Sequence, residues 1–161
     1  MLCGCRTKSR GVIRKSVSVA DRGKLLGISD MNNVIDKEEY KSGAGLGVYN
    51  VGGYKIGVCI ENDLLFPDGI KAQAMCGCNV IAVVMEELKN PMPPVLIRAY
   101  SYLYGVPIIM CAGNMAYFSE ITGDVASSSL QFSLFDVNMQ NSYHVVTART
   151  KGIYTEVRND Y

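Results

Sequence analysis

Reactive side chains follow one apolar segment of the sequence, in GVCIENDLLFPD at residues 57–68. The apolar residues predict a strand, and Pro67 predicts the first turn of a helix shortly after it. A strand end that meets a helix N-terminus stabilises anions, so Glu61 could act there as a nucleophile or base, and Asp63 could line a ligand pocket beside it. In the structural alternative, Asp63 and Asp68 only complement the helix dipole.

Cys59 supplies a thiol in the same stretch and is a second candidate nucleophile. Side chains alternate along a strand, so we expect Cys59 to point to the same face as Glu61, one pleat of about 6–7 Å deeper. Burial raises the pKa of a thiol, and no lysine or histidine stands immediately beside it in the sequence to lower that pKa. Cys59 is therefore the weaker candidate of the two.

Cys-Gly-Cys occurs twice, at residues 3–5 and 76–78, and four thiolates could enclose a zinc ion. Structural zinc sites usually separate paired cysteines by at least two residues, and both pairs border apolar strands. We therefore expect buried cysteines and no metal site. His144 is the one histidine, and no Gly-x-Ser-x-Gly elbow accompanies it, which favours an ordinary strand residue. The glycines at 43, 45 and 47 do not open a helix, so we expect no phosphate loop and no cofactor.

Turn signals predict the elements that position these residues. A polar, glycine-rich excursion over 30–46 separates two predicted hairpins. The first hairpin covers 12–29 with its loop at 21–23, and the second covers 46–60 with turn glycines Gly52 and Gly53. A short helix over 66–77 and a strand over 79–85, covered on both faces, follow. A helix over 93–105, with Leu96, Ala99, Tyr100 and Leu103 on one face, then precedes a strand over 106–113 and a β-rich tail. These elements favour one mixed α/β layered domain over residues 1–161.

Composition restricts the partners. The chain has 161 residues, of which 48% are hydrophobic, enough for a core. Sixteen Lys and Arg residues nearly cancel 15 Asp and Glu residues, so we expect no nucleic-acid or membrane partner, and a small molecule fits better. No apolar run approaches the ~20 residues that span a bilayer, and the first residues lack a secretory signal's apolar stretch. We therefore expect a cytoplasmic protein with reduced cysteines.

Several segments, in order, resemble the nitrilase, or carbon-nitrogen hydrolase, superfamily. They are RKSVSVADRGKLLG, Gly57 with the following Phe66-Pro67, CGCNVIAVV, LIRAYSYLYGVPIIMCAGN and ITGDVASSSLQF. The resemblance implies an α-β-β-α sandwich that assembles into dimers or larger oligomers. It also implies hydrolysis of nitriles, amides or carbamoyl groups by a Glu-Lys-Glu-Cys set, in which the cysteine attacks, glutamate moves protons and lysine stabilises the developing anion.

The resemblance places other residue types at the four catalytic positions. Glu61 stands at the cysteine position, four residues after Gly57, and Met31 stands at the lysine position, four residues after Gly27. Asp36 is a loose match to the second glutamate. The first glutamate belongs to an N-terminal region that these 161 residues do not contain, so we expect a sandwich that lacks its N-terminal strands.

The leading hypothesis from the sequence is a catalytically degenerate homologue that keeps a small-molecule pocket, with Asn62 and Asp63 in its lining, or an assembly role. The alternative is an active amide or nitrile hydrolase whose rearranged site uses Cys59 or Glu61. A third hypothesis is an interaction module, a homo-oligomer whose polar tail at 151–161 extends over a neighbouring subunit.

Overall fold

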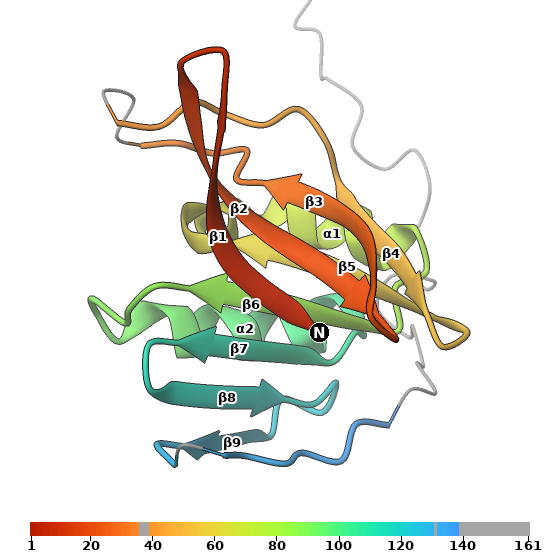
Figure 1. Cartoon of the computed structure of the whole chain (residues 1–161). Coiled ribbons are helices and arrows are strands. Elements are labelled where there is room, and N and C mark those ends of the chain that lie inside the picture. The colour runs from red at the N-terminus through yellow and green to blue at the C-terminus, as the bar shows by residue number, and fades with distance from the viewer. Residues whose placement is uncertain (36–38, 131, 139–161) are drawn as a thin grey trace, which may run out of the picture.

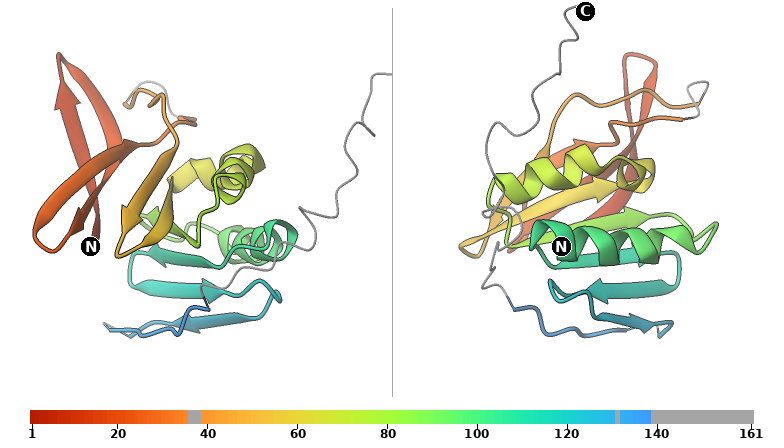
Figure 2. Two further views of the ribbon diagram at one scale, coloured as in Figure 1. Left: turned by 90° about the vertical axis from the view of Figure 1, so that its right-hand side faces the viewer. Right: turned by 180° about the vertical axis from the view of Figure 1, so that it is seen from behind.

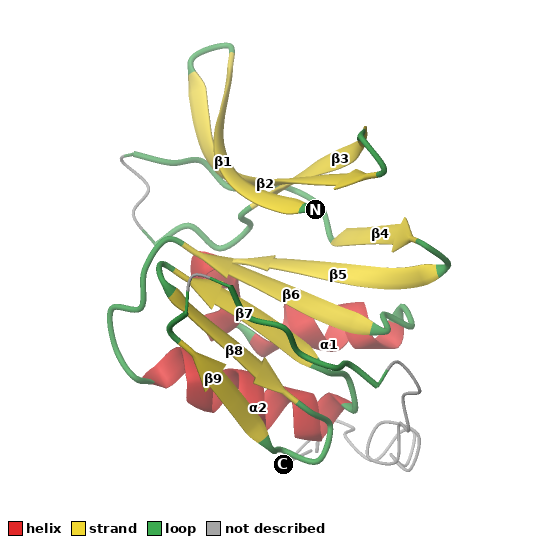
Figure 3. Cartoon of the chain, turned by 60° about the horizontal axis from the view of Figure 1, so that its bottom comes forward, coloured by secondary structure: helices red, strands yellow, loops and turns green. Residues whose placement is uncertain are grey.

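The computed structural model describes residues 1–35, 39–130 and 132–138. Three layers are stacked: a three-stranded sheet, a six-stranded sheet and a pair of helices (Figure 2). The helices cover one face of the six-stranded sheet, and the three-stranded sheet covers part of the other face (Figure 3). The mixed α/β class is confirmed. His144 and the tail at 151–161 lie outside the described residues.

The three-stranded sheet is antiparallel, in the order β1 (Leu2–Ser9), β2 (Val12–Asp21) and β3 (Lys24–Asp30). Each connection is a tight turn with two consecutive residues at positive φ, Arg10-Gly11 and Arg22-Gly23. Such turns match the right-handed twist of paired strands. The hairpin predicted over 12–29 is confirmed, and β1 adds a third strand that extends with β2 beyond the end of β3 (Figure 1).

The six-stranded sheet follows chain order, from β4 (Gly47–Val51) and β5 (Tyr54–Ile60) through β6 (Val80–Met85) to β7 (Ile108–Ala112), β8 (Met115–Ser119) and β9 (Val125–Ser128). The central strands β5, β6 and β7 are parallel, and the flanking pairs are antiparallel. The second predicted hairpin, with its turn at Gly52 and Gly53, is confirmed, as is the doubly covered strand β6.

Helix α1 (Pro67–Met75) begins at the predicted proline, and α2 (Met92–Tyr104) ends at Gly105 in the left-handed conformation. The predicted face of α2 is partly wrong, because Leu103 is 44% exposed and the helix buries Ile97 and Ser101. Val95, Tyr102 and Leu103 are apolar but exposed, so apolar spacing alone does not define the buried face. The Ser101 hydroxyl lies 2.6 Å from the buried Ser119 hydroxyl of β8, which orients the helix on the sheet.

The apolar core forms two clusters, one on each face of the six-stranded sheet. Between helices and sheet lies a cluster that includes Cys59, Ile81 and Ile97. Between the two sheets lies a second cluster that includes Val17, Met31 and Ile60. The end of β5 therefore borders both clusters, and the polar residues after it stand at the rim of the inter-sheet layer.

Burial of both cysteine pairs was predicted, and it is wrong for Cys3 and Cys76, which are exposed. Each lies near the start or end of an element rather than inside the sheet core. Within the described ranges, no group of three or more His, Cys, Asp or Glu residues could hold a metal ion. No helix among the described residues is long and apolar enough to cross a membrane.

Candidate functional site

Glu61 occupies a sharp turn at the end of β5. Its φ is +49°, a left-handed value that non-glycine residues seldom adopt, and a 3₁₀ helix, η1 (Glu61–Leu65), begins there. This turn interrupts the alternation of the strand. Cys59 points into the cluster under the helices, whereas Glu61 lines cavities at the rim between the sheets, so the expectation that both share a face is wrong.

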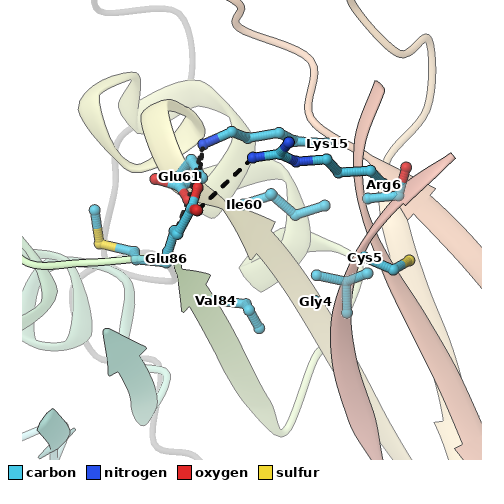
Figure 4. Close-up of a pocket in the computed structure, with 11 residues that line it drawn as sticks. Gly4, Cys5, Arg6, Lys15, Ile60, Glu61, Val84 and Glu86 are labelled. Carbon is cyan, nitrogen blue, oxygen red and sulfur yellow. Dashed lines mark hydrogen bonds and ion pairs between the residues drawn. The ribbon is translucent and has the colours of Figure 1, made fainter. Parts of the chain in front are cut away.

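The Glu61 carboxylate binds a lysine that comes from the other sheet. Lys15 of β2 places its Nζ 3.3 Å from Glu61 Oε1 and 3.1 Å from Glu86 Oε2 (Figure 4). The backbone N–H of Glu86 donates to Glu61 Oε1 at 2.7 Å. Arg6 lies 3.8 Å from Glu86, so two cations and two carboxylates form one network across the sandwich.

The network keeps Lys15 charged. Partial burial by itself would lower the pKa of Lys15, but hydrogen bonds and charges from Glu86 and Glu61 outweigh this, and the pKa is raised. The hydrogen bond from Lys15 holds the pKa of Glu86 below its ordinary range. The ring of Tyr40 lies 5.4 Å from Lys15 Nζ and adds a cation–π contact. At neutral pH the site therefore contains an ammonium group beside carboxylates.

Two cavities meet at this network. An inter-sheet cavity of about 250 Å³ is lined by β1, β2, β5 and β6, and includes Arg6. A loop cavity of about 230 Å³ opens between the loop after β3, η1 and the loop after β6. Lys15, Glu61 and Met85 line both. The remaining described residues of the loop cavity are Met31, Val34, Glu39, Tyr40, Asn62, Leu64, Leu65, Glu87, Lys89, Asn90 and Pro93.

The structure brings together three of the six residues that the sequence singled out. Met31, Glu61 and Asn62 line the same loop cavity, and Met31 is buried there. Asp63 lines a separate small cavity, and its carboxylate accepts hydrogen bonds from the backbone N–H groups of Asn32 and Asn33. Asp36 lies outside the described residues. A ligand contact by Asn62 or Asp63 stays a prediction.

Cys59 is poorly placed to act as a nucleophile. Its side chain is 4% exposed, and burial raises the pKa of its thiol well above the ordinary value, with a smaller contribution from the charge of Asp63. A thiolate nucleophile needs a cationic neighbour and access to the substrate. Cys5 also lines the inter-sheet cavity, but its sulfur points away from the Glu61 network (Figure 4).

Sequence analysis missed Lys15 and Glu86. Lys15 lies on β2 and Glu86 follows β6 of the other sheet, 71 positions away, so local patterns do not connect them. A signal was present for Lys15: it shares the inward face of β2 with Ile13, Val17 and Val19, which contribute to the inter-sheet cluster. A charged residue in an apolar alternation of this kind indicates a partner across the sheets.

Known structures resemble this fold. No protein-family model matches the sequence, and no curated protein matches it. A carbon-nitrogen hydrolase from Helicobacter pylori superposes with a TM-score of 0.68 at 14% identity, covering 77% of this chain and 55% of its own. A mutant amidase from Nesterenkonia, of the nitrilase superfamily, superposes with a TM-score of 0.67 at 16% identity, and the match covers 77% of this chain and 54% of the amidase. A nitrilase-superfamily member from Saccharomyces cerevisiae superposes with a TM-score of 0.69 at 15% identity, and the match covers 76% of this chain and 52% of the yeast protein.

These similarities define the fold as that of the nitrilase, or carbon-nitrogen hydrolase, superfamily. The chain spans about half the length of the three structures, so its two sheets and two helices correspond to part of their fold. The predicted fold class is therefore confirmed.

Proposed function

We propose that this chain is a carbon-nitrogen hydrolase homologue that binds a small molecule in the loop cavity without hydrolysing it. One observation carries the proposal: the strained residue at the end of β5 is Glu61, whose carboxylate is already bound by Lys15 and by the Glu86 N–H. A cavity of about 230 Å³ remains open beside these groups.

The chemistry of Glu61 argues against turnover. A carboxylate that attacked an amide would form a mixed anhydride and would have to expel an amine. That step needs a proton donor for the amine and a cation for the developing oxyanion. Lys15, the cation that contacts Glu61, is engaged by two carboxylates, and the family's lysine position holds the apolar Met31.

The alternative is an active amide or nitrile hydrolase with a rearranged site. The Nesterenkonia amidase, which has this fold, carries acrylamide added at its active-site cysteine in one mutant structure. Here the corresponding thiol would have to be Cys59, which is buried on the other face of the sheet, or the reaction would have to use Glu61. The geometry favours the binding protein.

Ligand-observed NMR with a panel of small amides, nitriles and carbamoyl compounds tests this proposal. We expect saturable binding by the wild-type protein. It should be lost in Leu65→Trp, because Leu65 is 47% exposed at the loop cavity and a larger ring there fills it. Leu103→Trp, at a similarly exposed position of α2 that does not line the cavity, is the control. Binding unaffected by Leu65→Trp would contradict the location, and no binding by any member of the panel would contradict the function.

A further inference from the structure

Basic side chains are concentrated at the beginning of the chain. Residues 1–20 contain five of them and no acidic residue, whereas residues 21–161 carry 15 acidic and 11 basic side chains. The near-neutral average of the chain, on which the expectation of no nucleic-acid partner rests, therefore conceals a positive segment on a negative remainder. The five basic residues are Arg6, Lys8, Arg10, Arg14 and Lys15.

These residues lie on an arm that β1 and β2 form together. β2 pairs with β3 only from Ser16 to Asp21, so residues 6–9 of β1 and 12–15 of β2 extend beyond β3 (Figure 1). Four residues in each strand, at about 3.3 Å a residue, make the arm about 13 Å long. Arg10-Gly11 is the turn at its tip. The Lys41 N–H donates to the Ile13 carbonyl oxygen at 3.0 Å and ties one edge of the arm to the loop after β3.

The arm presents cations on both faces and at its tip. Residues directly opposite each other in an antiparallel pair share a face, and successive residues of a strand alternate between faces. Lys8 lies opposite Ile13, the residue before Arg14, so Lys8 and Arg14 point to opposite faces. Lys8 and Arg10 are exposed, and neither makes an ion pair or hydrogen bond within the part of the chain that the structure describes.

In the described ranges, the carboxylates that contact the arm bind residues near its base. Glu61 and Glu86 hold Lys15, and Glu86 also lies 3.8 Å from Arg6. Arg14 Nε is 3.8 Å from Asp30, a long contact, and a guanidinium has five N–H donors, so Arg14 can bind a further acceptor. The positive charge toward the tip is therefore available to a partner.

A partner that uses all three available cations must carry negative charge on both sides of the ribbon. An acidic protein surface or an anionic membrane would face only one side. The major groove of duplex DNA lies between two phosphate backbones, is about 12 Å wide and 8.5 Å deep, and admits a two-stranded β-ribbon. It therefore brings phosphates to both faces at once. The acidic remainder of the chain repels these phosphates, which favours contact through the arm.

We propose that the β1–β2 arm binds duplex DNA by entering its major groove, with Lys8 and Arg14 facing opposite phosphate backbones and Arg10 at the tip. Contacts to phosphates carry no sequence information, so binding is independent of base sequence. This activity is separate from the loop cavity, and neither one depends on the other.

Fluorescence anisotropy with a labelled DNA duplex of about 20 base pairs, titrated at several NaCl concentrations, tests the proposal. Three phosphate contacts predict that log Kobs falls with log[NaCl] with a slope of about −2.7. Arg10→Gln should bring this slope closer to zero by about one and weaken binding about tenfold near 50 mM salt. Arg22→Gln is the matched control, because Arg22-Gly23 forms the same kind of turn at the other end of β2.

Variants on the two faces test entry into a groove. Lys8→Gln and Arg14→Gln should each bring the slope closer to zero by about one, with unfolding curves to show that both proteins are folded. A partner that touches one face would leave one of the two slopes unchanged, which would overturn the groove. An RNA duplex of the same sequence should bind more weakly, because its major groove is too narrow for the ribbon.

Each remaining outcome bears on the partner. Equal or tighter binding of the RNA duplex, the single DNA strand, polyglutamate or phosphatidylserine vesicles would overturn duplex DNA as the occupant. No binding of the duplex at the lowest salt concentration would overturn the proposal altogether, as would equal losses in Arg10→Gln and Arg22→Gln. Binding of small molecules at the loop cavity is unaffected by any of these results.

Discussion

At Glu61 the backbone and the side chain are held by different parts of the molecule. The left-handed backbone costs on the order of 1–3 kcal/mol for a residue with a side chain, so surrounding contacts must fix it. Lys15 from the other sheet and the Glu86 N–H from the end of β6 supply those contacts. The Asp63 carboxylate, bound by the Asn32 and Asn33 N–H groups, holds the same turn independently of the side chain at position 61, so we expect another side chain there still to project toward Lys15.

The first prediction uses this projection. In Glu61→Cys, the thiol should lie beside the Lys15 ammonium, which lowers its pKa and speeds alkylation. We expect acrylamide at pH 7 to label residue 61 faster than the exposed Cys3, Cys76 and Cys111, and to label Cys59 most slowly, because burial raises the pKa of that thiol. Peptide mapping by mass spectrometry measures all these rates in one sample.

Adding Lys15→Met to Glu61→Cys provides the control, since it removes the cation and should slow labelling at residue 61 to the rate of an ordinary exposed thiol. Residue 61 labelled no faster than Cys59 in the single variant would show that this side chain does not face the cavity.

A second prediction concerns stability and pH. Lys15→Met should lower the free energy of unfolding by about 1–2 kcal/mol at pH 7, because it leaves the Glu61 carboxylate, 16% exposed, without its cation. Glu86 has a lowered pKa, so its contribution is present above the ordinary 4.5 and disappears as the pH falls through the folded value. Lys15 has a raised pKa, so its contribution is present below 10.5 and disappears as the pH rises further.

Urea unfolding of both proteins between pH 3 and pH 11 measures this difference. It should be constant from about pH 6 to pH 9 and shrink at both extremes. Lys8→Met, at an exposed position of β1, is the control and should change little at any pH. A difference that is equally large at pH 3 would mean that Lys15 acts through packing rather than charge.

The sequence alone identified Glu61 and Met31 as site residues, but not Lys15 and Glu86. The order of the segments around Gly57 placed Glu61 and Met31 at one site, and both line the loop cavity. Lys15 and Glu86 could not be found in this way, because their contact forms only when the two sheets are stacked. Interactions between distant segments depend on the fold, whereas a strand end is visible locally.

At the scale of elements, Asp63 connects η1 to the loop that follows β3. Its carboxylate accepts from the Asn32 and Asn33 backbone N–H groups at 2.6–3.1 Å and from Asn33 Nδ2 at 2.9 Å. These bonds hold the segment that carries Met31 and Val34 to the cavity wall. Asp63 therefore holds one wall of the loop cavity in place although its own side chain does not line that cavity.

The third prediction follows from this connection. Asp63→Ala should lower the free energy of unfolding by about 2–3 kcal/mol, since it leaves several partly buried donors without their charged acceptor. It should also weaken ligand binding at the loop cavity. Asp63→Asn keeps one acceptor oxygen, so its stability and its ligand binding should fall between those of the wild type and of Asp63→Ala. Thermal unfolding and NMR titration measure the two properties. Unchanged stability in Asp63→Ala would mean that the loop is held by other contacts.

A fourth prediction compares two glycines next to the site. A Cβ at Gly57 in β5 would come within 2.8 Å of Gln73 Oε1 and 3.0 Å of Ile81 Cγ1, so Gly57→Ala should cost about 1–3 kcal/mol. A Cβ at Gly69 in α1 meets no atom within 4 Å, so Gly69→Ala should be neutral or stabilise the protein by up to about 1 kcal/mol. Urea unfolding of the pair gives the comparison. Equal effects would contradict the close approach of α1 to β5.

Elements with strong turn signals were predictable, and contacts between elements were less so. Gly23, Gly52 and Pro67 mark boundaries that the structure confirms, because each backbone conformation favours its residue type. The buried face of α2 was not predictable. Apolar residues such as Val95 and Leu103 lie on its exposed side, and the Ser101–Ser119 contact that orients the helix joins two segments without a distinctive sequence pattern.

At the scale of the whole molecule, the site lies where residues of both sheets and two loops meet, at the ends of β5 and β6, and Figure 4 shows the residues of the two sheets that face each other there. The sandwich brings opposite charges together across its apolar layer, and the rim leaves them accessible to a ligand. Association into homo-oligomers stays a prediction, and light scattering at several concentrations would test it. The fold could be inferred from the order of segments, whereas the salt-bridged network of Lys15, Glu61 and Glu86 could be seen only once the two sheets are stacked.

Turnover is the most direct test of the central claim, that a bound carboxylate at the end of β5 has replaced a nucleophile. The purified protein should be incubated with amides, nitriles and carbamoyl compounds, beside Glu61→Gln and Cys59→Ala, with unfolding curves to show that each sample is folded. We predict no hydrolysis above the uncatalysed rate in any of the three proteins. Hydrolysis by the wild type that either substitution abolishes would contradict the claim and identify the working nucleophile.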